Sequence, residues 1–321
     1  MKKNIIILIL FIIAFLAGWI ASYYLREPRK VIIKEYDIKY NTITKVIKDM
    51  SCDDAKADLE CFFTGIPFEQ RMQKIAEIGY KYIEFWHPEG TFNGSAIDFA
   101  QAKDAKSLKR TACENGLKFN DFAFGAWNGS IGGNATNSTD QAKWLAQGQK
   151  MLDFANAIEC PKGIILSGMT QKNLTAEQMN ENLLAAFGKA AKMAEKAGVV
   201  LVIEPLNSLV DHGGYYLDKT DEAVKIIRQI NSKNLKLLYD VYHMQIMQGN
   251  ILDFLAKNID IIGHFHSAGV PGRAELFDTE VNYPAIIKKI DELGYKGCFG
   301  LEYFPKMDHK ESLKRTLGYF R

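Results

Sequence analysis

The sequence predicts an α/β fold, a (β/α)8 TIM barrel preceded by an N-terminal transmembrane helix. Short β-rich runs alternate with longer amphipathic stretches, this unit occurs eight times in about 265 residues, and one uncharged apolar run stands before it. Strict β/α alternation favours a parallel sheet, and eight units match the count of a closed barrel. A doubly wound open sheet is the alternative, but no GxGxxG follows the first strand and no GxxxxGKS or GxxxxGKT motif occurs.

Composition restricts the class of protein. The chain has 321 residues, 47% hydrophobic and 24% charged, with 8 prolines, which excludes disordered, collagen-like and disulfide-scaffold classes. Residues 1–50 carry nine Lys/Arg against four Asp/Glu, so the remainder is net −3 although the whole chain is +2. A nucleic-acid enzyme concentrates basic charge on its folded part, so we expect no nucleic-acid partner. The 5 cysteines lack CxxC spacing and favour neither a disulfide framework nor a zinc ribbon.

The apolar run extends from Ile5 to Leu25 without a charged residue. As a helix it spans about 30 Å of hydrocarbon, which predicts a transmembrane anchor. Trp19, Tyr23 and Tyr24 near its far end suit the membrane interface. A cleaved signal peptide is the alternative, but its apolar region would be shorter, and no good small-x-small cleavage site appears.

Flanking charges bear on the orientation of this anchor. Lys2 and Lys3 directly before the apolar run form the pattern that opens a secretory signal, so we expect the barrel on the extracytoplasmic side. Basic residues after the run argue the other way by the positive-inside rule. The predicted organisation is a tail over 1–4, a signal-anchor helix over 5–25, a linker over 26–56 and the barrel over 57–321.

Hydrophobic periodicity and end signals give the bounds of the barrel elements. We expect strands at Asp58–Phe63, Tyr82–Trp86, Lys118–Phe124, Gly163–Ser167, Val199–Glu204, Leu235–Asp240, Ile261–His266 and Phe299–Tyr303. We expect helices at Pro67–Ile78, Ile97–Glu114, Gln141–Ala157, Ala176–Ala197, Asp221–Ile230, Ile251–Lys257 and Tyr283–Leu293. Glycines just past several helix ends, and a capping box that begins at Thr175, support these bounds.

Ligand-type residues end four consecutive strands: Glu204, Asp240, His266 and Glu302. In a barrel these ends converge at one mouth, where active sites of this fold lie. A lone acid at a strand exit is commonly just solvated, but four such residues in succession make that interpretation poor. Each follows an apolar run, and burial without compensation would cost several kcal/mol. A shared divalent cation removes that cost, and three carboxylates with one imidazole suit Mn²⁺, Mg²⁺ or Co²⁺.

Two loop residues are candidates for substrate contacts at this mouth. His243 lies three residues after Asp240 and can reach over the mouth, with a helix-capping histidine as an equal alternative. Arg273 lies in a Pro-Gly turn after the seventh strand, where it can bind a ligand carboxylate or hydroxyl. A solvated arginine is the alternative.

Three further residues are weaker candidates for the same role. His264 points to the same side of its strand as His266, into the barrel, where a core histidine is the commoner case. His87 and Trp127 can form an apolar or stacking wall, with core packing as the alternative.

Several segments resemble the hydroxypyruvate isomerase family. They are Ile203–Asn207, Tyr239–Gln245, Ile262–His266 with Pro271–Arg273, Val281–Pro284 and Gly300–Tyr303. The likeness covers roughly residues 57–320 and is dense from Val199 onward. This family belongs to the xylose-isomerase-like barrels, whose relatives include 2-oxo-tetronate isomerases and ketose 3-epimerases.

The resemblance implies roles for the strand-end residues. It makes Glu204, Asp240, His266 and Glu302 metal ligands, with Glu204 and Glu302 also the catalytic acid/base pair. Hydroxypyruvate isomerases usually have Gln where this chain has His266, as ketose epimerases do, so the substrate stays open between a hydroxy-oxo-acid and a sugar. The apolar segment is a second departure, because the typical enzyme is soluble and cytoplasmic.

We therefore expect a metal-dependent isomerase that works through an enediolate, converting hydroxypyruvate to tartronate semialdehyde or a related aldose–ketose pair. A ketose 3-epimerase is the first alternative. A phosphodiesterase of the endonuclease IV type would need more His and Glu ligands and a basic groove. A membrane-tethered sugar-binding protein without turnover is disfavoured because both glutamates are retained. Barrels of this kind often pair, which leaves a homo-oligomer open.

Overall fold

The computed structural model describes residues 55–320, which lie within one compact unit. The predicted tail, the predicted membrane segment over 5–25 and nearly all of the predicted linker lie outside the described residues. No helix within residues 55–320 has the length and apolar character needed to cross a bilayer.

Eight parallel strands form the barrel wall, in the spatial order β5-β2-β1-β10-β9-β8-β7-β6. They are β1 (Ala55–Asp58), β2 (Tyr82–Phe85), β5 (Lys118–Phe122), β6 (Lys162–Ile165), β7 (Val200–Ile203), β8 (Leu235–Asp240), β9 (Ile262–Ser267) and β10 (Phe299–Leu301). The two ends of this sheet meet through a parallel bridge between Ala123 and Ile164 and a 2.9 Å hydrogen bond from Phe124 N to Ile164 O. The predicted eight-stranded parallel barrel is confirmed.

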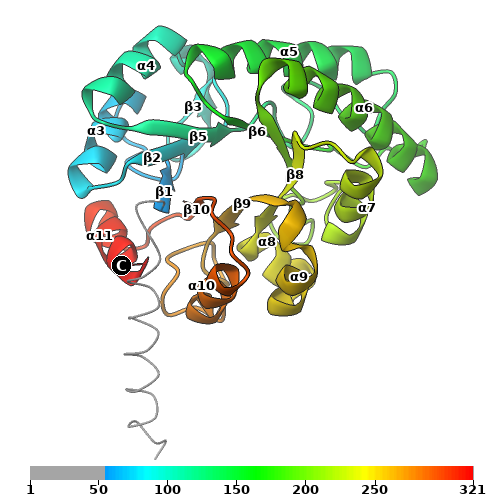
Figure 1. Ribbon diagram of the computed structural model, residues 1–321. Coiled ribbons are helices and arrows are strands. Elements are labelled where there is room, and N and C mark those ends of the chain that lie inside the picture. Colours follow the sequence, from blue (N-terminus) through cyan, green and yellow to red (C-terminus); the bar gives the residue numbers. More distant parts are fainter. Residues whose placement is uncertain (1–54, 321) are drawn as a thin grey trace, which may run out of the picture. The chain divides into compact units, whose positions relative to one another are not determined.

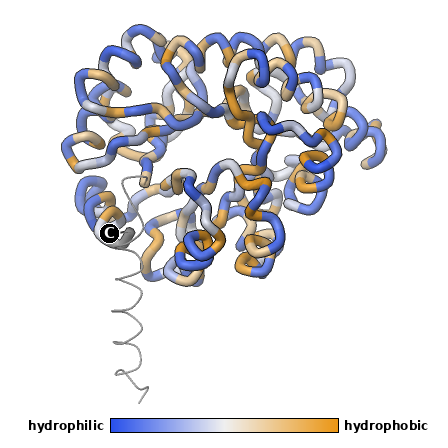
Figure 2. Tube along the Cα trace, in the orientation of Figure 1, coloured by the Kyte–Doolittle hydropathy of each residue, from blue (hydrophilic) through white to orange (hydrophobic). Residues whose placement is uncertain are grey.

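The helices surround the strands (Figure 1). They are α3 (Phe68–Ile78), α4 (Ala105–Glu114), α5 (Gln141–Ala157), α6 (Ala176–Ala197), α7 (Thr220–Ile230), α8 (Val241–Met247), α9 (Ile251–Asn258), α10 (Tyr283–Glu292) and α11 (His309–Phe320). Apolar and polar residues are mixed along both the strands and the helices (Figure 2). The apolar side chains of both layers form the core between wall and helices.

Local signals end and begin the helices as predicted. Gly79 and Gly198 adopt left-handed φ values of 107° and 71° at the C-caps of α3 and α6, a conformation that glycine reaches without steric cost. Thr175 and Gln178 form the expected capping box at the start of α6.

The first strand lies earlier than predicted. β1 occupies Ala55–Asp58 rather than Asp58–Phe63, and it begins within the range assigned to the linker. Charged Lys56 and Asp58 sit inside this strand, so it lacks the apolar character by which strands are recognised. The apolar run that follows is buried as irregular backbone, with Phe63 at a φ of 54°.

The helix predicted over Ile97–Glu114 is wrong in its first half. β3 (Thr91–Phe92) pairs with β4 (Ile97–Asp98) in a hairpin, a 3-10 turn follows over Phe99–Gln101, and α4 begins only at Ala105. Asp104 caps α4 by accepting from Ser107 N at 2.8 Å, which fixes the later start. Helices α8 and α11 are additional to the predicted elements.

Candidate metal centre at the barrel mouth

The four strand-end residues meet at one point. Glu204 directly follows β7, Asp240 ends β8, His266 lies in β9 and Glu302 directly follows β10. One ligand atom from each lies within 4.8 Å of the others, and all four residues are buried. We call these four residues the mouth cluster. The predicted convergence is confirmed.

His266 stands between the two glutamates of the mouth cluster. Its Nδ1 lies 3.1 Å from Glu204 Oε1 and 3.3 Å from Glu302 Oε2. Glu302 is held from two further sides, because Trp86 Nε1 donates to Oε1 at 2.8 Å and Arg273 donates to Oε2 at 2.6 Å. The carboxylate of Glu204 has the His266 hydrogen bond alone among the described residues, so it is the less restrained of the two.

Asp240 is fixed by the start of α8. Its Oδ1 accepts from Tyr242 N at 2.7 Å and from His243 N at 3.3 Å, so it caps the helix while Oδ2 lies 3.4 Å from His243 Nε2. Asn207 contacts His243 Nδ1 at 2.6 Å from the other side. His243 is fully buried, and its two imidazole nitrogens contact Asp240 and Asn207.

The pKa values of the acids in the mouth cluster are shifted in different directions, because burial raises them all and neighbouring cations outweigh burial only at Glu302. Burial, then the neighbouring Glu302 carboxylate, raises the pKa of Asp240 to about 7. Burial also raises the pKa of Glu204. Burial opposes ionisation of Glu302 as well, but Arg273 and His266 outweigh it and hold its pKa below the usual range. The carboxylates around His266 raise the pKa of its imidazole despite burial.

The donor set fits a divalent cation. Three buried carboxylates face one another, and Arg273, paired with Glu302, is the nearby permanent cation among the described residues. An oxygen-rich set with one imidazole matches Mn²⁺, Mg²⁺ or Co²⁺, and a cation would offset the repulsion that raises the pKa of Asp240. The geometry supports a divalent metal and leaves its identity open.

A cavity of about 250 Å³ opens above the mouth cluster. Glu204, Glu302 and Arg273 lie along it, and aromatic and histidine side chains form its walls. The wall includes the predicted His87 and Trp127, together with Trp86, Phe99 and His212. His212 carried no sequence signal, and it packs against Trp127 with ring centroids 4.9 Å apart.

His264 does not lie in this cavity, so the structure does not support a substrate contact for it. It shares the inward direction of His266 but sits deeper, fully buried beneath the mouth. There it contacts Glu84 at 3.0 Å, Asp121 at 3.2 Å and Lys56 Nζ at 3.1 Å. We call Lys56, Glu84, Asp121 and His264 the interior cluster; each is at most 1% exposed.

Three members of the interior cluster were not predicted from the sequence. Lys56 lies in β1, for which the predicted bounds were wrong. Glu84 and Asp121 lie within strands and not at the predicted strand ends. Charged residues inside β-rich runs of a barrel were the available signal, because an inward-facing charge needs a partner from another strand.

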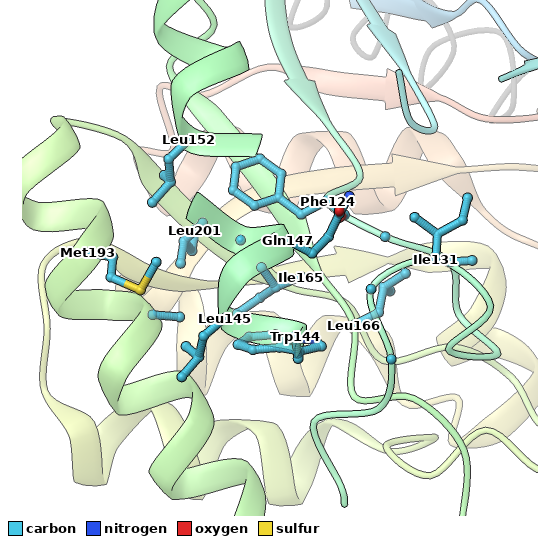
Figure 3. A pocket seen from close by; sticks show the side chains of 16 residues that line it. Phe124, Ile131, Trp144, Leu145, Gln147, Leu152, Ile165, Leu166, Met193 and Leu201 are labelled. Carbon is cyan, nitrogen blue, oxygen red and sulfur yellow. The ribbon is translucent and has the colours of Figure 1, made fainter. Parts of the chain in front are cut away.

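A second cavity, between the barrel wall and the outer helices, has a different character. Apolar side chains from α5, α6 and the strands, such as Leu145, Met193 and Ile165, point into it (Figure 3). Its volume is about 30 Å³, room for a water molecule or two and not for a substrate. The cavity above the mouth cluster is therefore the candidate substrate site.

The fold and the mouth cluster define a (β/α)8 barrel protein with a candidate divalent-metal centre. Residues 72–321 match the model of the Xylose isomerase-like TIM barrel family. The chain belongs to this family.

Curated relatives and a solved structure agree with that assignment. Hydroxypyruvate isomerase of Escherichia coli is 30% identical over 80% of this chain and 96% of its own length. A 2-oxo-tetronate isomerase of Cupriavidus necator is 30% identical over 78% of this chain and 92% of its own length. The crystal structure of an AP endonuclease, family 2, from Brucella melitensis matches with a TM-score of 0.74 and 27% identity, covering 83% of this chain and 98% of that one.

Proposed function

We propose that this isomerase interconverts α-hydroxycarbonyl compounds through an enediolate, with a divalent metal bound by Glu204, Asp240, His266 and Glu302. The observation that carries the proposal is the meeting of these four side chains below a cavity that both glutamates line. Hydroxypyruvate to tartronate semialdehyde is the reaction we favour, because of the likeness to hydroxypyruvate isomerase.

The metal would supply Lewis acidity: it would polarise the carbonyl and hydroxyl oxygens of the substrate and so acidify the C–H bond between them. The remaining steps belong to residues of the chain. One glutamate removes that proton, which leaves an enediolate. The hydroxyl proton passes to the former carbonyl oxygen, and the other glutamate returns a proton to the neighbouring carbon.

The two glutamates have different contacts, which favours different catalytic roles for them. Glu204 has a carboxylate with few partners beside the cavity, which suits proton removal. Glu302 is held by Trp86 and Arg273, and Arg273 lies on the cavity wall, where it can also orient a substrate oxygen. His87 and Trp127 would form side walls of the substrate site.

An epimerase is the second candidate function. The two glutamates come from different strands, β7 and β10, so they can address opposite faces of one carbon. Return of the proton to the opposite face of the same carbon gives epimerisation instead of isomerisation. His266, in place of the Gln usual in hydroxypyruvate isomerases, is the residue that favours this alternative.

A phosphodiesterase of the endonuclease type has less support. The mouth cluster offers four ligand residues, and the neighbouring interior cluster already contains a cation, Lys56. A three-zinc site would need further ligands beside the cavity. The family likeness to an AP endonuclease therefore bears on the fold more than on the reaction.

The test is proton NMR of the full chain in D₂O with Mg²⁺, hydroxypyruvate and a panel of neutral ketoses. We expect deuterium uptake at the carbon alpha to the carbonyl, dependent on the metal and lost in Glu302→Gln. Exchange with conversion to the isomer supports an isomerase, and exchange with inversion at one carbon supports an epimerase. No exchange with any panel member by folded, metal-loaded protein would contradict the proposal for these substrates.

The place of the protein in the cell is a separate proposal. We infer from the apolar run over 5–25 that the barrel is tethered to a membrane on the extracytoplasmic side. Protease accessibility of the barrel in intact cells would test this, and full protection from the outside would contradict it.

A further inference from the structure

We propose that Glu84 is a positioning residue for the metal centre: it binds Nε2–H of His266 so that Nδ1 faces the metal, and Lys56 is the internal cation that holds Glu84 in place. The proposal rests on the metal site of the proposed function. It extends that site to a side chain on β2, on the far side of the imidazole from the cavity.

The orientation of His266 supports the first half of the proposal. Its Nδ1 faces Glu204 and Glu302, while its Nε2 faces Glu84 Oε1 at 3.5 Å. Both Nε2 and Glu84 Oε1 are buried, and neither has a hydrogen-bond partner among the described residues. Metal-binding histidines almost always donate their second N–H to a carboxylate, a carbonyl or water, and Glu84 is the carboxylate placed to accept it.

Lys56 explains why Glu84 can stay in the barrel interior. Lys56 Nζ lies 3.5 Å from Glu84 Oε2 and 3.2 Å from Asp121 Oδ2, and none of these side chains is more than 1% exposed. Oε2 of Glu84 also contacts His264 Nε2 at 3.0 Å. One oxygen of Glu84 is therefore tied to the interior cluster, and the other is left for His266.

Gly300 gives independent support, because it makes room for the pair. On β10, a Cβ at this position would lie 2.5 Å from Glu84 Oε1 and 2.7 Å from His266 Cδ2. Both distances are too short for real contacts, so any side chain here would push the two groups apart. Gly300 is not in the left-handed region, so space and not backbone conformation is what glycine provides.

The interior cluster could instead be a second metal site, since Glu84, Asp121, His264 and His266 converge closely enough for one. Lys56 argues against this, because its ammonium group lies within 3.5 Å of three of these side chains. A metal there would have to compete with a cation of the chain itself. We therefore expect one metal per chain, bound at the mouth.

The experiment is calorimetric titration of the metal-free full chain with Mn²⁺. We expect one Mn²⁺ per wild-type chain and a roughly 10- to 100-fold weaker affinity for Glu84→Gln. Gly300→Ala, which changes no charge, should also weaken binding. Glu60→Gln is the matched control: Glu60 is a buried glutamate paired with a lysine, Lys103, and it contacts no member of the mouth cluster, so its affinity should equal that of the wild type.

A second measurement uses the wild type alone and does not depend on how the variants fold. In ¹⁵N NMR of the Mg²⁺-loaded chain, His266 should carry its proton on Nε2, with the downfield shift of an N–H bound to a carboxylate. A proton on Nδ1, equal affinities for the wild type and Glu84→Gln, or two Mn²⁺ per chain would each overturn the inference. A wild type that binds no Mn²⁺ would instead overturn the proposed function, so the two failures are distinguishable.

Discussion

The mouth cluster and the interior cluster are built from the same chemistry and differ in where their positive charge comes from. Each brings carboxylates and an imidazole together in the barrel interior, and His266 lies between them. The interior cluster is sealed and contains Lys56, whereas the mouth cluster opens on a cavity and has Arg273 on one glutamate only. A group of buried acids therefore indicates a metal centre when the chain does not supply enough positive charge of its own.

The pKa values of the acids differ between the two clusters in the same way. Glu84 is buried, but His266 and Lys56 outweigh burial and lower its pKa well below the usual range. Asp240 is equally buried, and burial together with Glu302 raises its pKa to about 7. The mouth cluster therefore gains more from an added cation than the interior cluster does.

The largest expected effect is on turnover at the mouth cluster. Glu302→Gln removes a proposed acid/base group and a metal ligand at once, so we expect kcat to fall on the order of 10³-fold or more. The steady-state rate on the substrate identified by NMR is the measurement, with circular dichroism to check the fold.

Glu275→Gln is the matched control for this change. Glu275 is a buried glutamate that accepts from Lys306 N at 3.0 Å and Ser312 Oγ at 3.1 Å, contacts that a glutamine oxygen can keep. Its rate should be close to that of the wild type. If Glu302→Gln also turned over at near the normal rate, the assignment of Glu302 would be lost.

The next effect is on stability at the interior cluster. Lys56→Met keeps most of the side-chain volume but leaves Glu84 and Asp121 buried without their cation, so we expect a loss of about 3–5 kcal/mol in the free energy of unfolding. Urea denaturation measures this. Adding Asp121→Asn should restore part of the loss because it removes one of the unpaired charges. Lys74→Met, at an exposed position of α3, is the control and should change the free energy of unfolding little. An equally small loss for Lys56→Met would show that the interior cation is not needed for stability.

The mouth cluster was predictable from sequence and the interior cluster was not, for a physical reason. Glu204, Asp240, His266 and Glu302 each end an apolar run, and strand ends of a parallel barrel must converge, so position along the chain already implies proximity. The interior contacts depend on which inward-facing residues share a level of the barrel. Strand register sets this, and the misplacement of β1 hid Lys56 altogether.

The helical layer shows the same contrast. The bounds of α6, marked by the capping box at Thr175 and by Gly198, were predicted to the residue. Those of α5 were also predicted to the residue, from its hydrophobic periodicity. The segment before α4 was not predicted correctly, because it forms a hairpin instead of a helix. The contacts that hold this segment come from residues distant in the sequence. Lys103 reaches Glu60 at 2.6 Å and the carbonyl of His87 at 3.0 Å, contacts that no local pattern reveals.

Histidines extend the comparison to acid stability. His266 lies among carboxylates that raise its pKa, whereas burial and Lys103 lower the pKa of His87 to about 4. The unfolded chain takes up a proton on His87 near pH 6.5 and the folded chain only near pH 4, so stability is lost as the pH falls between these values. We expect the free energy of unfolding to fall between pH 7 and pH 4.5 by about 2–3 kcal/mol less in His87→Phe than in the wild type. Urea denaturation of the metal-free proteins at the two pH values measures this. Equal losses would mean that His87 is protonated as readily in the folded chain as in the unfolded one.

The smallest expected effect comes from a glycine outside both clusters, whose surroundings are open where those of Gly300 are crowded. Gly188 lies within α6, and a Cβ there would meet no atom within 4 Å. Gly188→Ala should stabilise the protein by about 0.5–1 kcal/mol in urea denaturation, because alanine loses less backbone entropy in a helix. The same substitution at Gly300 introduces the same methyl group into the contact between Glu84 and His266. If both variants were stabilised and bound Mn²⁺ equally well, the space beside Glu84 would have no role in the metal centre. Opposite outcomes would show that glycine at Gly300 is required by that contact.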